Sequence, residues 1–186
     1  MDLVFPTDRP DGNASRLWRL QLDLMREAEA ALGQRDMSKQ LCQPAFGNGG
    51  PVVVNTPNLD GAFARLSNNA AGYWPTAVYE LAHETVHLLN PVVGMTNWFE
   101  EGVAVRFSVG ISARTTHPMA PPVGDRYYKA LTSVNELRPC ILEVAGTIRA
   151  VYGKLSDVTP GILTKLFPNA NADLLKRLCD RWSPRP

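Results

Sequence analysis

The chain has 186 residues, 45% of them hydrophobic, so it is long enough to bury the core of one domain, and wholesale disorder is excluded. Its 19 lysines and arginines nearly balance its 18 aspartates and glutamates, and no basic cluster with interleaved aromatics stands out, which argues against a nucleic-acid partner. The first residues lack a basic start and a long apolar stretch, and no later run reaches membrane-spanning length. We therefore expect one cytoplasmic domain over residues 1–186 and no membrane partner.

The first part of the chain predicts one helix and a small sheet. Apolar residues at helical spacing predict a helix from Ala14 to Leu32, which Gly33 ends. Val52–Asn55 predicts a short buried strand, and the alternation in Ala62–Leu66 predicts a second one. We therefore expect a small β-sheet or hairpin before the next helix, in a mostly helical α+β domain.

The next helix carries the most informative motif of the chain. Pro75 suits a first helical turn and Pro91 stops the run. At about 100° per residue, the polar residues gather on one side and the apolar residues on the other. This pattern predicts a helix with one core face and one face that lines a polar cleft.

Two of the three histidines of the chain lie on that polar face, in the sequence His83-Glu84-Thr85-Val86-His87. The i, i+4 spacing directs both imidazoles to one side of a helix, which is the arrangement of an H-E-x-x-H zinc site with the glutamate as general base. The alternative is that the histidines are ordinary polar residues on a solvated helix face. A third ligand decides between the two, because catalytic zinc takes three protein ligands and keeps one position open.

The sequence offers two neighbouring candidates for the third ligand. A metzincin continuation is excluded, because Asn90 and Val93 stand where that motif needs glycine and histidine. After a short loop, a second helical segment begins at Trp98 and contains Glu100 and Glu101. Successive helical residues differ by about 100° in direction, so only one of these carboxylates can point squarely at the metal.

The segment Trp98-Phe99-Glu100-Glu101-Gly102-Val103-Ala104 resembles the W-x-x-E-G-x-A motif of the gluzincins, zinc peptidases of the thermolysin and aminopeptidase kind. The resemblance covers about His83 to Phe107 directly. It implies a zincin-like fold, a bound Zn²⁺ ion, and His83, His87 and Glu101 as its ligands. It also implies that an edge strand binds the substrate backbone, for which Ala62–Leu66 is our candidate.

The resemblance further implies an oxyanion donor from beyond the third ligand. Tyr127 and Tyr128 are our candidates because they lie beside an irregular loop expected after Phe107, and Tyr152 and His117 are the alternatives. Gluzincins often orient a ligand with an aspartate four residues after the glutamate, but this chain has Val105 there. The residues that we expect to take over this role are Glu100, Asn97 or Glu80.

The rest of the chain predicts scaffold. Gly102 is expected to let two helices approach closely, and Cys42, Cys140 and Cys179 are expected to be buried thiols without a disulfide framework. Helical patterns cover about 126–137, 139–152, 159–166 and 172–182.

The function predicted from these motifs is zinc-dependent hydrolysis of peptide bonds in a peptide or protein substrate. Glu84 is the predicted general base, and endopeptidase action is preferred because the chain has little room for accessory domains. The alternative is a non-catalytic zinc-binding or regulatory module on a gluzincin scaffold. The oligomeric state stays open.

Overall fold

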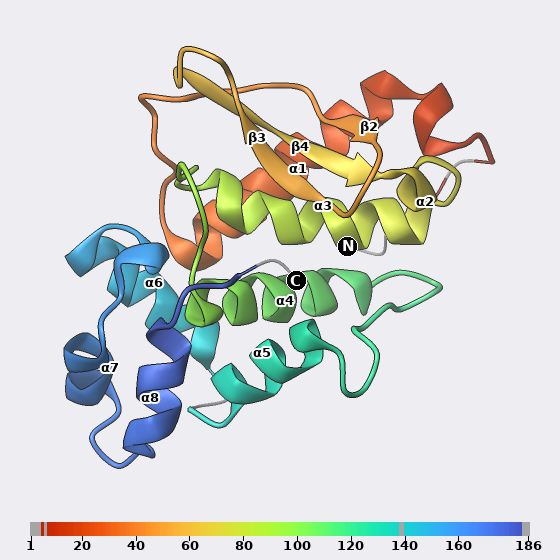
Figure 1. Ribbon diagram of the computed structural model, residues 1–186. Coiled ribbons are helices and arrows are strands. Elements are labelled where there is room, and N and C mark those ends of the chain that lie inside the picture. The colour runs from red at the N-terminus through yellow and green to blue at the C-terminus, as the bar shows by residue number, and fades with distance from the viewer. Residues whose placement is uncertain (1–4, 6, 138–139, 184–186) are drawn as a thin grey trace. The chain divides into compact units, whose positions relative to one another are not determined.

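The computed structural model describes residue 5 and residues 7–137 and 140–183. The chain is a mostly helical α+β protein, and its described residues form one small sheet (Figure 1). It divides into two compact units, and one domain over residues 1–186 stays a prediction. No helix in the described part of the chain is both long enough and apolar enough to cross a membrane.

The first unit holds the sheet and the helix that carries the histidines. Its elements are η1 (Pro10–Gly12), most of α1 (Ala14–Leu32), β1 (Gln40–Leu41), β2 (Ala45–Gly47), β3 (Val52–Asn55), β4 (Gly61–Ser67), α2 (Asn68–Ala71), α3 (Trp74–Leu88) and the end of α4 (Trp98–Ser112). The helix predicted from Ala14 to Leu32 is confirmed, and Gly33 follows it with a φ of +89°. A hairpin of β3 and β4 precedes α3, as expected.

The strand β4 is the centre of the sheet. It pairs with β3 in antiparallel register, Val54 opposite Phe63, and with β1 and β2 in parallel register on its other side. Our candidate for a substrate-binding edge strand, Ala62–Leu66, is therefore wrong, because pairing on both sides uses its backbone groups. The strand predicted at Val52–Asn55 is confirmed as β3, but its predicted burial is wrong, since Val52 is exposed and the other three residues are half-buried.

Helix α3 begins at Trp74 with Pro75 in its first turn and packs against β4 and β3 (Figure 1). Glu80 ties it to the sheet, because its carboxylate accepts hydrogen bonds from the backbone N–H and the hydroxyl of Ser67, at 2.8 and 2.6 Å. Gln21 of α1 donates its side-chain amide to Thr85 at 2.8 Å. The helix thus takes its position from the sheet and from α1.

The second unit is helical. Besides the start of α4 and the end of α1, its elements are α5 (Arg126–Asn135), α6 (Ile141–Tyr152), η2 (Leu155–Asp157), α7 (Pro160–Leu166) and α8 (Ala172–Cys179). The four predicted carboxy-terminal helices are present, with Thr159 as the N-cap of α7 and Gly153 after α6. Pro139, where we expected one of them to begin, lies outside the described residues.

The last predicted helix ends earlier than expected. We expected it to continue to Trp182, but α8 ends at Cys179. Residues 180–182 instead pair with residues 96–98: the N–H of Trp98 donates to Asp180 at 3.1 Å and that of Trp182 donates to Thr96 at 2.9 Å. These hydrogen bonds replace the ones that another helical turn would make.

Gly102 lets α4 and α5 approach closely, as predicted. A Cβ atom at this position would lie 2.4 Å from Cγ1 of Val134 and 2.7 Å from the backbone oxygen of Ala130. Both distances are far below van der Waals contact, so only glycine fits without a shift of α5.

Candidate metal centre

The two histidines of the motif face each other on α3. Their Nε2 atoms lie 3.2 Å apart, and the ring planes are inclined by 65°. Both side chains are buried, with exposed fractions of 6% for His83 and 8% for His87. Two imidazole nitrogens this close need a proton or a cation between them, because two lone pairs would otherwise face each other.

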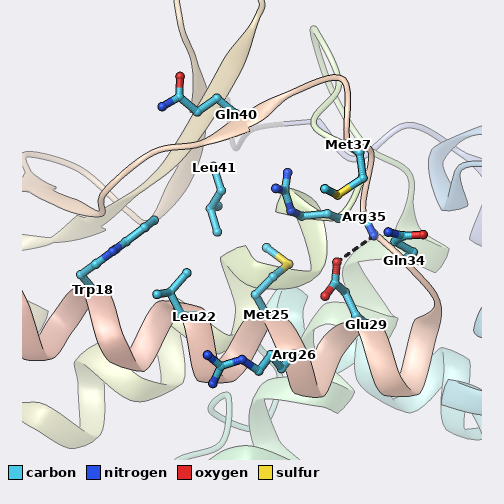
Figure 2. A pocket seen from close by; sticks show the side chains of 10 residues that line it. All are labelled: Trp18, Leu22, Met25, Arg26, Glu29, Gln34, Arg35, Met37, Gln40 and Leu41. Atoms are coloured by element: carbon cyan, nitrogen blue, oxygen red, sulfur yellow. Dashed lines mark hydrogen bonds between the residues drawn. The ribbon is translucent and has the colours of Figure 1, made fainter.

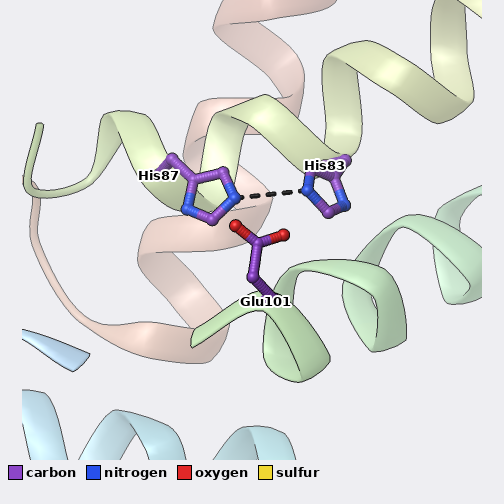
Figure 3. Close-up of side chains that lie close together, drawn as sticks. All are labelled: His83, His87 and Glu101. Carbon is purple, nitrogen blue, oxygen red and sulfur yellow. Dashed lines mark hydrogen bonds between the residues drawn. The ribbon is translucent and has the colours of Figure 1, made fainter. Parts of the chain in front are cut away.

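The carboxylate of Glu101 completes a group of three possible ligands. His83, His87 and Glu101 each offer one ligand atom, and these atoms all lie within 4.8 Å of one another. Figure 3 shows the carboxylate and the two rings turned toward the same region. Glu100, the other candidate of the sequence, does not belong to this group among the described residues.

The donor set suits a zinc ion. Zinc binds imidazole nitrogen at about 2.0–2.1 Å, so a tetrahedral site places two such nitrogens about 3.3 Å apart. The separation of the two Nε2 atoms in this structure, 3.2 Å, is close to this value. Two neutral imidazoles and one carboxylate are also a common set of three protein ligands in catalytic zinc sites.

Glu84, the expected general base, is buried with 3% of its surface exposed. The sequence predicted a polar cleft on this face of α3, but His83, Glu84 and His87 are all buried. The periodicity of a helix separates polar from apolar residues, yet it does not show what covers the polar side.

Glu101 is held by a contact that the sequence analysis missed. The hydroxyl of Thr96 donates a hydrogen bond to Oε1 of Glu101 at 2.6 Å. The two residues are five apart, at the N′ and N4 positions on either side of the start of α4. The known sequence pattern at this spacing is a pair of apolar residues, so it does not predict a hydroxyl paired with a carboxylate. The sequence signal nearest to this contact is Asn97, a good N-cap residue three positions before Glu100. It indicates the helix start but not the role of Thr96.

Two of the residues expected to orient the ligands have other roles. The Asn97 side chain caps α4, since its oxygen accepts from the N–H of Glu100 at 2.8 Å, and its amide group donates to the Leu155 backbone at 2.9 Å. Both carboxylate oxygens of Glu80 bind Ser67. Glu100 is buried, and its part in orienting a ligand stays a prediction.

The candidates for the oxyanion donor lie in different surroundings. Tyr127 and Tyr128 are half-buried in the first turn of α5, and the Tyr127 ring packs on Trp182 with centroids 5.2 Å apart. Tyr152 is exposed, and so is His117. The rings of His117 and Tyr73 are in a T-shaped arrangement with centroids 6.2 Å apart. A role for either tyrosine of α5 stays a prediction.

The three cysteines are free thiols, as expected, but they are not all buried. Cys140 is exposed, while Cys42 and Cys179 are half-buried. Burial, and then the neighbouring charge of Asp180, raise the pKa of the Cys179 thiol to about 11. This thiol therefore stays protonated and unreactive at neutral pH.

A surface cavity of about 450 Å³ lies beside α1 (Figure 2). Its lining residues are Trp18, Leu22, Met25, Arg26, Glu29, Gln34, Arg35, Met37, Gln40 and Leu41. Two of the lining residues form a hydrogen bond with each other: the backbone N–H of Arg35 donates to the Glu29 carboxylate at 3.2 Å. None of the three candidate metal ligands lines this cavity.

Comparison with protein-family models, with curated proteins and with solved structures finds no match for this chain.

Proposed function

We propose that the chain is a gluzincin-like zinc peptidase that hydrolyses peptide bonds in peptide or protein substrates. The observation that supports the proposal most is the group of His83, His87 and Glu101, whose donor atoms lie within 4.8 Å of one another. The sequence supplies the second support, because a motif with a general base in it leads into a W-x-x-E-G-x-A segment.

Each residue of the site has a separate task in this proposal. His83 and His87 would hold the metal through ring nitrogens, and Glu101 would hold it through its carboxylate. Zinc, when bound, acts as a Lewis acid that lowers the pKa of water and polarises a carbonyl group. Glu84 accepts the proton that the attacking water loses and passes it to the leaving amine nitrogen, so the peptide bond breaks into a carboxylate and an amine.

The oxygen of the scissile carbonyl becomes negatively charged during this reaction. A phenol donor stabilises that charge, and we assign the role to Tyr128 or Tyr127. Endopeptidase action is the preferred form of the activity.

A second candidate function is a zinc-binding or regulatory module without catalysis. It is favoured by burial, since Glu84 is only 3% exposed and the two histidines are 6% and 8% exposed. Against it stands Glu84 itself, because a structural zinc ion needs no general base and normally takes a fourth protein ligand.

Cleavage profiling of a mixed peptide library with wild type and Glu84→Gln tests the proposal. We expect about one zinc per chain in both proteins, and a loss of at least ~100-fold in kcat in the variant, because the amide cannot accept a proton from water. Zinc binding by a wild type that cleaves nothing in the library would favour the module. Absence of zinc binding by the wild type would refute both candidates.

A further inference from the structure

We infer that Thr96 is the positioning residue that orients the carboxylate of Glu101, and that the carboxy-terminal segment Asp180–Trp182 holds Thr96 in place. The inference rests on the proposed function in one respect, namely that Glu101 is a metal ligand. It adds that metal affinity depends on Thr96 and on the carboxy-terminal segment, which both lie outside the two metal-binding motifs.

The contact between the two side chains is short and directional. The Thr96 hydroxyl lies 2.6 Å from Oε1 of Glu101, within the range of O–H···O⁻ hydrogen bonds. A hydrogen bond to one oxygen restricts rotation of the carboxylate plane, and this rotation decides where the carboxylate points. Partners of this kind set the orientation of metal ligands and raise their affinity for the ion.

The hydroxyl of Thr96 does not supply the N-cap of α4. Asn97 is the residue that caps α4, because its side-chain oxygen accepts from the N–H of Glu100 at 2.8 Å. A threonine before a helix often acts as the cap itself, but here that position belongs to its neighbour. The contact with Glu101 is thus additional to the cap that Asn97 provides.

The backbone around Thr96 is fixed by the last described residues of the chain. The carbonyl of Thr96 accepts from the N–H of Trp182 at 2.9 Å, and Asn97 forms an antiparallel bridge with Arg181. The N–H of Trp98 donates to Asp180 at 3.1 Å. This two-stranded pairing leaves Thr96 little freedom to move away from Glu101.

Aromatic packing holds the pairing together. The rings of Trp98 and Trp182 meet edge to face with centroids 4.6 Å apart, and the Arg126 guanidinium lies 3.6 Å above the Trp182 ring. Trp182 is 9% exposed. Loss of this ring would therefore loosen the segment that carries Thr96.

The test compares the zinc affinities of Thr96→Val, Thr96→Ser and the matched control Thr164→Val. Valine keeps the shape of threonine without the hydroxyl, and serine keeps the hydroxyl. Thr164 is an exposed residue of α7 whose hydroxyl donates to the backbone of Pro160 at 2.8 Å. Competition with a chromophoric chelator gives the zinc dissociation constants, and the absorption spectrum of bound Co²⁺ reports the coordination.

We expect Thr96→Val to weaken zinc binding about 10- to 100-fold and to change the Co²⁺ spectrum, because orienting partners of metal ligands typically contribute this much. Thr96→Ser and Thr164→Val should bind like the wild type. Trp182→Ala should weaken zinc binding in the same direction as Thr96→Val. If Thr96→Val does not fold, Thr96→Ala takes its place in the comparison.

The outcomes separate this inference from the proposed function. Wild type that binds no zinc would overturn both. Wild type that binds zinc, with a folded Thr96→Val that binds it equally well, would overturn the role of Thr96 alone. Unchanged affinity in a folded Trp182→Ala would overturn the role of the carboxy-terminal segment.

Discussion

Glu100 and Glu101 are adjacent buried carboxylates in the first turn of α4, and they differ in their partners. The donor atoms of Glu101 and of the two histidines lie within 4.8 Å of one another, and Thr96 binds Glu101 at 2.6 Å. The capping residue Asn97 accepts from the backbone of Glu100. The proposed metal site therefore takes Glu101, and not Glu100, as its third ligand.

Replacement of Glu101 by alanine should raise the zinc dissociation constant by at least ~10-fold, since a direct ligand matters no less than its orienting partner. The matched change Glu100→Ala should have a much smaller effect. Chelator competition on both variants, with circular dichroism as the control for folding, measures the difference. A larger effect at Glu100 would mean that the motif is aligned one residue off.

The candidate metal ligands could be predicted from the sequence, but the residues that contact and cover them could not. The i, i+4 spacing of His83 and His87 fixes their common direction on any helix, and a motif match singled out Glu101. The burial of Glu84 depends on segments that are distant in sequence. The contact from Thr96 to Glu101 depends on how the chain enters α4. Local spacing carries no information about either.

Among the helices and strands, too, some could be predicted from the sequence and others could not. Long helices such as α1 were predicted with their bounds, because periodicity and an ending glycine act locally. The strands β1 and β2 have two and three residues and pair with β4 from more than a dozen residues away, so no periodic signal reveals them. Alternation identified β4 as a strand but could not show that both of its edges are occupied.

The contact between α4 and α5 at Gly102 gives a prediction for stability. Gly102→Ala should lower the free energy of unfolding by about 1–3 kcal/mol, the usual effect of overpacking, because the new methyl group would meet the backbone oxygen of Ala130 at 2.7 Å. Unfolding in urea measures the change.

Gly110 offers a matched control in the same helix. It is exposed, and a Cβ atom there meets nothing within 4 Å. Gly110→Ala should therefore raise the free energy of unfolding by up to ~1 kcal/mol, the difference in helix propensity. Equal effects at the two positions would contradict the close approach of α4 and α5.

For the whole molecule, the proposed metal site predicts that metal binding and folding are linked. The ligands come from α3 and α4, and an unfolded chain does not hold His83, His87 and Glu101 together. Free zinc at 100 times its dissociation constant should stabilise the folded state by about 2.7 kcal/mol. In a chain of this size, that corresponds to a rise in Tm of roughly 5–10 °C.

Thermal unfolding with excess zinc and then with a chelator measures this rise, and His83→Ala/His87→Ala provides the control. The double variant should unfold at one temperature under both conditions, because it keeps only one of the three ligands. An equal zinc effect on wild type and double variant would place the ion elsewhere on the chain, and the assignment of the metal centre would fail. A rise in the Tm of wild type alone would tie the stabilising ion to the two histidines. Their Nε2 atoms lie 3.2 Å apart, so a cation bound by both rings requires both residues.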